Sequence, residues 1–205
     1  LIRTLGTLLK PDRGLVRVGG LDAARAGRAV RRTIGVVTHE PMLYDQLTGH
    51  ENLTFTARMF GLDDVEERVL DSAERMGVTS RLHQRVAAMS HGLRKRFNIA
   101  RALLHDPLVL LLDEPLGSLD PIVRSDLQQD LRDIFCTLNK TVVLVTHDMG
   151  EAGFFGDIIV LMREGRIVQQ GTLSQLINEP ADNFVERFIR AQRTALHVLE
   201  EGAES

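Results

Sequence analysis

The sequence contains a single cysteine, Cys136, among its 205 residues. No internal disulfide can form, and a reducing compartment is the simpler expectation. Long apolar runs are missing too, because the longest obvious one, residues 108–112, is far below the roughly 20 residues needed to cross a bilayer. These absences exclude a disulfide-stapled domain and disfavour a protein that crosses a membrane through these residues.

A basic excess is absent as well. The net charge of -3 argues against a general nucleic-acid binder, so no nucleic-acid partner is expected. Hydrophobic residues make up 43% and charged residues 26%, which is typical of an ordinary globular protein. A chain of this length can build one domain with a substantial core and a small second lobe.

Short apolar runs alternate with helical stretches along the chain. Four runs are apolar on both faces, as expected of parallel strands covered by helices on both sides: 33–37, 108–112, 141–146 and 157–162. Shorter strands are expected at 15–18, before a Gly-Gly turn, and at 165–171, after a tight Glu-Gly turn. The alternation predicts an α/β fold.

Helical spacing of apolar residues predicts the connections. Residues 122–138 have a 3.6-residue period and join two of the apolar runs, which predicts a right-handed β-α-β unit. An apolar face over the first nine residues predicts a helix there. Residues 42–104 look helical without convincing strands, as a helical insertion would. The tail, 172–205, is expected to be helical with a break at Glu179-Pro180.

The string LVLLLDEPLGSLDP carries the strongest signal for chemistry. Its apolar strand ends in Asp113 and Glu114, and open α/β sheets bind ligands at the carboxyl ends of their strands. One carboxylate there can hold Mg²⁺, and the other can orient or deprotonate a water molecule. An acidic turn without chemistry explains an aspartate after an apolar run about equally well, but the complete string is far more specific.

With these residues the chain resembles the ATP-binding subunits of ABC transporters. LLLDEP is similar to their Walker B strand, which implies magnesium binding by Asp113 and catalysis by Glu114. LGSLD is similar to the D-loop, which ends here at Asp120, and LVTHD is similar to the switch strand with its catalytic histidine, His147. Because His147 follows the carboxylates by one β-α-β unit, it is expected at the same edge of the sheet.

MSHGLRKRFNIARALLHDP is similar to the family's signature motif and the helix that follows it. Ser90 is expected to cap this helix, and the resemblance implies that Ser90 and Gly92 clasp the γ-phosphate of ATP held by a second subunit. His91 stands where the family usually has glycine, and Leu93 where it has glutamine. Most of the basic residues that follow are interpreted as a solvated helix face: Arg94, Lys95, Arg96 and Arg101.

GVVTHEPMLYDQLTGHENL is similar to the Q-loop region, with His39 where the family normally has a nucleotide-contacting glutamine. An imidazole has one acceptor nitrogen when neutral and can gain a proton near physiological pH. Altered, pH-sensitive coupling is therefore expected at His39.

A phosphate-cradling G-x-x-x-x-G-K-[ST] string does not occur in the 205 residues. The opening LIRTLGTLLKPDRG is similar to the helix that leaves this loop in the family. The chain is therefore expected to be N-terminally truncated after the Walker A loop, with a P-loop NTPase (RecA-like) parallel-sheet core that is incomplete at its N-terminus. As printed, it is expected to bind ATP weakly or not at all.

The resemblance also implies a domain organisation and partners. It implies a RecA-like core over 1–40 and 105–175, a helical subdomain over 41–104 and a helical tail over 176–205. ATP and Mg²⁺ are the implied cofactors. A transmembrane permease and a homodimer or heterodimer of ATPase subunits are the implied partners, at the cytoplasmic face of the inner (plasma) membrane.

Direction and cargo stay open. The first half of the chain is similar to heme- and drug-exporter ATPases, and the second half to importer ATPases for osmoprotectants such as glycine betaine. Two other functions remain: a non-catalytic remnant that pairs with a competent ATPase or permease, and an ABC-type ATPase of DNA repair or translation.

Overall fold

A computed structural model of the chain describes residues 1–117, 119–138 and 140–201, with the side chains of residues 138 and 193–201 excluded. Ser118, within the LGSLD string, lies outside the described residues. The chain divides into two units, Leu1–Val145 and Thr146–Ser205, which are described in turn. Within the described residues, no helix is both long enough and apolar enough to span a membrane.

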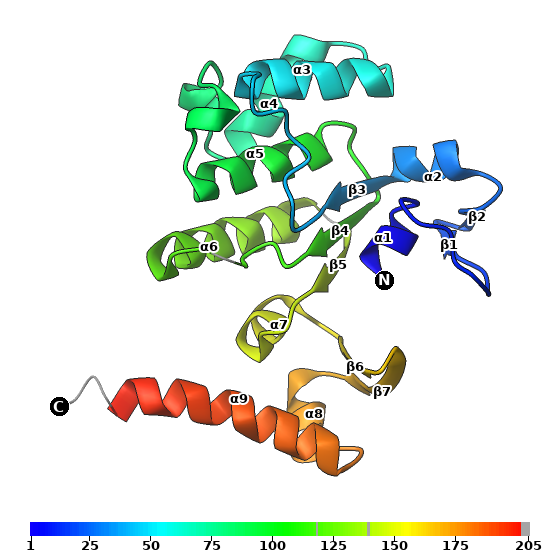
Figure 1. Cartoon of the computed structure of the whole chain (residues 1–205), viewed down its shortest axis with the longest axis vertical. Helices are drawn as coiled ribbons and strands as arrows, with labels where there is room; N and C mark the ends of the chain where they lie inside the picture. Colours follow the sequence, from blue (N-terminus) through cyan, green and yellow to red (C-terminus); the bar gives the residue numbers. More distant parts are fainter. Residues whose placement is uncertain (118, 139, 202–205) are drawn as a thin grey trace. The chain divides into compact units, whose positions relative to one another are not determined.

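A three-stranded parallel sheet forms the centre of the first unit (Figure 1). Its order is β3 (Ile34–Val37), β4 (Val109–Asp113) and β5 (Thr141–Val145), with Val37 opposite Leu112 and Asp113 opposite Val145. Leu110, Leu111 and Leu112 of central β4 are almost completely buried. Helix α6 (Pro121–Leu138) connects β4 to β5, so the predicted β-α-β unit is confirmed.

The N-terminal segment forms less helix than its apolar spacing predicts. Helix α1 spans only Ile2–Leu5, and Leu8 and Leu9 are exposed, so the helix expected over nine residues is wrong beyond Leu5. Thr7 adopts a positive φ of 59°, and the N–H groups of Leu8 and Leu9 both donate to the Arg3 carbonyl. These hydrogen bonds satisfy the Arg3 carbonyl at the end of α1, and the chain reversal at Thr7 ends the helix.

A small hairpin and a helix follow. Strands β1 (Arg17–Val18) and β2 (Leu21–Asp22) pair antiparallel across Gly19 and Gly20, whose positive φ values of 55° and 78° suit a two-residue hairpin turn. Helix α2 (Gly27–Thr33) then leads into β3. One apolar cluster joins these elements to the sheet, and its buried members are Ile2, Val18, Val30, Ile34 and Leu111.

The segment between β3 and β4 is helical, as predicted. It contains α3 (Gly49–Phe60), α4 (Val65–Arg75), α5 (His91–Leu103) and the short 3-10 turns η1 (Thr79–Arg81) and η2 (Val86–Ala88). Among the described residues of this segment, Thr48 and Arg85 form an isolated antiparallel β-bridge. The expected boundaries of this subdomain, 41 and 104, stay a prediction.

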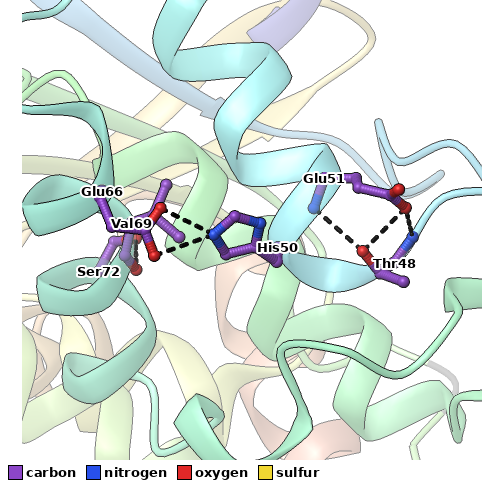
Figure 2. Close-up of polar contacts among 6 residues, drawn as sticks. All are labelled: Thr48, His50, Glu51, Glu66, Val69 and Ser72. Carbon is purple, nitrogen blue, oxygen red and sulfur yellow. Dashed lines mark hydrogen bonds and ion pairs between the residues drawn. The ribbon is translucent and has the colours of Figure 1, made fainter.

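Local sequence explains where α3 begins and ends. Thr48 and Glu51 form a reciprocal capping box, in which the Glu51 N–H donates to the Thr48 hydroxyl and the Thr48 N–H donates to the Glu51 carboxylate (Figure 2). Gly61, with φ of 63°, ends the helix. His50 on α3 contacts the Glu66 carboxylate on α4 at 2.9 Å, which ties the two helices together (Figure 2).

The second unit contains α7 (Met149–Phe155), β6 (Ile159–Arg163), β7 (Arg166–Gly171), α8 (Leu173–Asn178) and α9 (Asn183–Glu201). The expected break at Glu179-Pro180 separates α8 from α9. The expectation that 157–162 is a strand buried on both faces is wrong. Strand β6 pairs antiparallel with β7, and Val160 and Met162 are exposed, because the tight Glu164-Gly165 turn with two positive φ values closes a local hairpin.

Candidate active site

The two predicted carboxylates lie where β4 ends. Asp113 is the last residue of the strand, and the Glu114 N–H still donates to the Val145 carbonyl at 2.9 Å. Glu114 then takes a positive φ of 48°, which is strained for a residue with a side chain. Its carbonyl accepts the Gly117 N–H at 3.1 Å, so the chain turns sharply and leaves two half-buried carboxylates at the edge of the sheet.

Lys95 is the site residue that sequence reasoning missed. Its side chain is 0% exposed, and its ammonium donates to the carbonyls of Glu114 at 3.4 Å and His39 at 3.5 Å. Burial lowers the pKa of Lys95, while the negative charges of Glu114 and Asp113 act in the opposite direction. The sequence did contain a signal for the burial of Lys95. Lys95 lies three positions after Gly92 and seven positions before Ala102, and these spacings put it on the same helix face as these two buried residues.

The solvated basic face predicted for this helix is wrong. None of the four basic side chains is exposed, and each arginine donates to a backbone carbonyl: Arg94 to Ala87, Arg96 to Met76 and Arg101 to Val36. Arg96 also pairs with Asp130 on α6. Burial lowers the pKa of Arg101 to about 10. These contacts attach α5 to its neighbours, so the basic run is part of the packing.

Ser90 and Gly92 form the start of α5. The Ser90 hydroxyl accepts the Leu93 N–H at 3.3 Å, which confirms the predicted cap. A Cβ on Gly92 would lie 2.5 Å from Val123 of α6, so only glycine permits this approach. An open groove of about 890 Å³ lies beside them, lined also by Arg96, Asp126 and Asp130. The wall from α6 is acidic, and Arg96 on α5 supplies positive charge.

His91, between Ser90 and Gly92, has neighbours of positive charge. Partial burial and the charges of Lys95 and Arg94 lower the pKa of His91, and His39 contributes in the same direction. The imidazole therefore tends to stay neutral at this helix start.

His39 and Asp120 take different places. His39 lies in the loop after β3 with its side chain exposed, and its carbonyl is the group that contacts Lys95. Asp120 is exposed, and its carboxylate accepts the Ile122 N–H at 3.0 Å at the start of α6. In this structure Asp120 therefore acts as a helix-capping residue.

His147 belongs to the second unit, where its side chain is exposed and its carbonyl accepts a hydrogen bond from Gln192 at 3.4 Å. Asp148, next to it, caps α7 through the N–H groups of Gly150 and Glu151. The placement of His147 at the same sheet edge as the carboxylates stays a prediction.

The parallel sheet, the acidic end of β4 and the capped helix α5 define a mixed α/β ATPase fold. A family model described as ABC transporter matches residues 1–117. The chain belongs to the ABC transporter family.

Two curated relatives and one solved structure extend this comparison. The chain is 34% identical over 196 residues to the glycine betaine transport ATP-binding protein OpuAA of Bacillus subtilis, covering 92% of this chain and 47% of OpuAA. It is 38% identical over 197 residues to the Fe(3+) ions import ATP-binding protein FbpC of Streptomyces coelicolor, covering 95% and 56%. The chain thus spans about half the length of the curated relatives it matches.

The structure of cbiO1 from Clostridium perfringens, part of the ABC transporter complex cbiONQ, is similar with a TM-score of 0.76 and 26% identity. The match covers 99% of this chain and 81% of cbiO1. The predicted α/β fold with a parallel-sheet core is confirmed.

Proposed function

We propose that the complete protein hydrolyses ATP as the nucleotide-binding subunit of an ABC importer. The observation that carries this is the pair Asp113 and Glu114 at the carboxyl end of β4, in a chain of the ABC transporter family. Both curated relatives described above are named as transport or import ATP-binding proteins, which favours import over export. Their cargoes differ, so the transported substrate stays open.

The donor chemistry at the end of β4 fits Mg²⁺. Proteins usually hold this ion through one or two carboxylates together with substrate phosphates, and Asp113 and Glu114 supply that number. Asp113 would bind Mg²⁺, and the ion would neutralise negative charge on the phosphates.

Glu114 would accept the proton of the water that attacks the γ-phosphate in line. Its backbone supports this role, because hydrogen bonds from its N–H and to its carbonyl hold the strained residue in one orientation. Ser90 and Gly92 would contact the γ-phosphate of ATP bound by the second ATPase subunit. His147 would support that phosphate and the attacking water, with His39 and Asp120 beside the nucleotide.

The 205 residues contain no phosphate-cradling G-x-x-x-x-G-K-[ST] string. We infer that ATP hydrolysis by the complete protein requires such a loop, which cradles the phosphates. The upstream coding sequence tests this inference. Codons for such a loop in the same reading frame would support it, and an in-frame start codon at Leu1 would favour the non-catalytic remnant.

A transmembrane permease would be the partner, with the subunit peripheral at the cytoplasmic face of the inner membrane. The helical segment offers an apolar surface for it, since Tyr44 and Phe55 are exposed and contact each other edge to face at 5.4 Å between ring centroids. Met42 and Met59 are exposed in the same segment. Methionine and aromatic side chains are common at such protein contacts.

The test uses the complete protein reconstituted with its permease. Glu114→Gln should lower kcat for ATP hydrolysis by about 10²–10⁴-fold, because general base catalysis is lost, while ATP binding persists. Glu74→Gln, at an exposed position on α4, is the control and should keep the parental rate. An unchanged rate in Glu114→Gln would contradict the proposal, and stimulation by DNA or RNA in place of the permease would favour the repair or translation alternative.

A further inference from the structure

Lys95 combines complete burial with contacts to two separate parts of the candidate site. Lysine is almost never fully buried unless its charge is compensated. Here the ammonium meets the carbonyl oxygens of Glu114 and His39, and the negative charges of Glu114 and Asp113 act on it. Burying this charge for stability alone would be a poor solution, because an apolar side chain of similar volume is often as stable or more stable.

The first contact acts on the residue with the strained backbone. The Glu114 carbonyl receives both the Gly117 N–H at 3.1 Å and the Lys95 ammonium at 3.4 Å. Two donors on one carbonyl fix the plane of the peptide that follows Glu114. Because that residue has a φ of 48°, relaxation of this peptide would redirect the carboxylate.

The second contact reaches the loop after β3. Lys95 meets the His39 carbonyl at 3.5 Å, and one turn further along α5 the Asn98 side chain accepts the Met42 N–H at 3.3 Å. Two residues on one face of the helix therefore hold the loop of residues 38–48. The same helix begins at Ser90 and Gly92, less than two turns before Lys95.

We propose that Lys95 is a positioning residue that links the start of α5 to Glu114 and to the His39 loop. Contact of a γ-phosphate with Ser90 and Gly92 would thereby be transmitted along one rigid helix to the backbone that aims the Glu114 carboxylate. Helix α5 is suited to this, since the Gly92–Val123 approach and the Arg96–Asp130 pair fix it against α6. The proposal rests on the ATP hydrolysis proposed above.

The experiment compares Lys95→Met, which removes the donors and keeps the length, with Lys95→Arg, which keeps donors and charge. Glu74→Gln, at an exposed position on α4, is again the control. ATPase kinetics of the complete protein with its permease, Tm and amide hydrogen exchange are measured for each variant. Lys95→Met should lower kcat at least tenfold with KM for ATP within twofold and Tm equal or higher, and Lys95→Arg should recover part of kcat.

Amide hydrogen exchange tests the contacts of Lys95 independently of ATPase activity. In Lys95→Met the amides of Gly117 and Met42 should exchange faster, while those of α3 and α4 keep their parental rates. Unchanged exchange at both amides, kcat within twofold of the parent, or a loss of activity that follows a loss of Tm would overturn the proposal. If the parental protein itself has no ATPase activity, the proposed function fails, and the exchange comparison still tests Lys95.

Discussion

At several positions in this protein the backbone lies so close to neighbouring atoms that glycine alone fits. At Gly49, the first residue of α3, a Cβ would lie 2.4 Å from the ring of Phe97 on α5. At Gly35 in β3, a Cβ would lie 2.5 Å from the Ala102 carbonyl. Neither glycine has a positive φ, so the need for glycine at these positions is one of space and not of backbone conformation.

We predict that Gly49→Ala destabilises the complete protein by about 1–3 kcal/mol, because the added methyl overpacks the contact with Phe97. Gly27→Ala at the start of α2 is the matched control, since its Cβ would meet only the flexible end of Arg31 at 3.3 Å. Urea unfolding measures both variants. Equal stabilities for Gly49→Ala and Gly27→Ala would contradict the steric argument.

At the scale of the secondary-structure element, α3 has the most complete set of local signals in the described chain. The Thr48 and Glu51 capping box begins it, Gly61 ends it, and the contact between His50 and Glu66 attaches it to α4. The backbone N–H of Thr48, followed by its hydroxyl, lowers the pKa of Glu51 from its ordinary value of 4.5. Ionised Glu51 therefore stabilises the folded state.

This shift makes the stability of α3 depend on pH. Because the folded-state pKa is lowered, the stabilising effect of Glu51 is fully present above pH 4.5 and is lost as the pH falls through the lowered value. Glu51→Gln should therefore be less stable than the parent at neutral pH, and the difference should shrink toward zero in acid. Thermal unfolding between pH 7 and pH 3 measures it.

Thr48→Ala is the control for the pH effect. Thr48→Ala removes the hydroxyl, the second cause of the shift, and keeps the backbone N–H, the largest cause. Glu51→Gln in a Thr48→Ala background should therefore show a weaker dependence on pH that does not vanish. A difference of constant size from pH 7 to pH 3 would rule out the role of the Glu51 charge.

At the scale of the whole molecule, the 205-residue chain exposes apolar surface over both units. Strands β3 and β5 are the outer strands of the described three-stranded sheet, and both are rich in β-branched residues. Exposed aliphatic side chains are also prominent, with Ile122 74% and Ile158 61% accessible. Outer strands of this kind are sites of association.

We predict that the 205-residue chain, expressed by itself, is poorly soluble and self-associates, whereas the complete protein with its permease is not. Size-exclusion chromatography and thermal unfolding of the two preparations measure this. A monomeric 205-residue chain that melts cooperatively would contradict this prediction.

Particular residues show which features of the fold and the candidate site local sequence patterns could predict. The run LVLLLDE predicted both the buried strand and the two carboxylates at its end, because two-sided apolarity and the position of a polar residue are local properties. Ser90 was predicted as a helix cap for the same reason. Lys95 was assigned to solvent, because a lysine in a basic run looks like every other surface lysine until the carbonyls of His39 and Glu114 surround it.

The sequence by itself determined the α/β class, three of the four expected parallel strands, the helical character of residues 42–104 and the carboxylates at the end of β4. Each of these depends on periodicity or on residue types within one segment. Only the tertiary structure decided that α1 stops at Leu5, that β6 turns into a hairpin with β7, and that Lys95 lies buried against Glu114. These outcomes depend on competing contacts between residues that are distant in the sequence or on turn geometry, which a pattern of apolar residues does not encode.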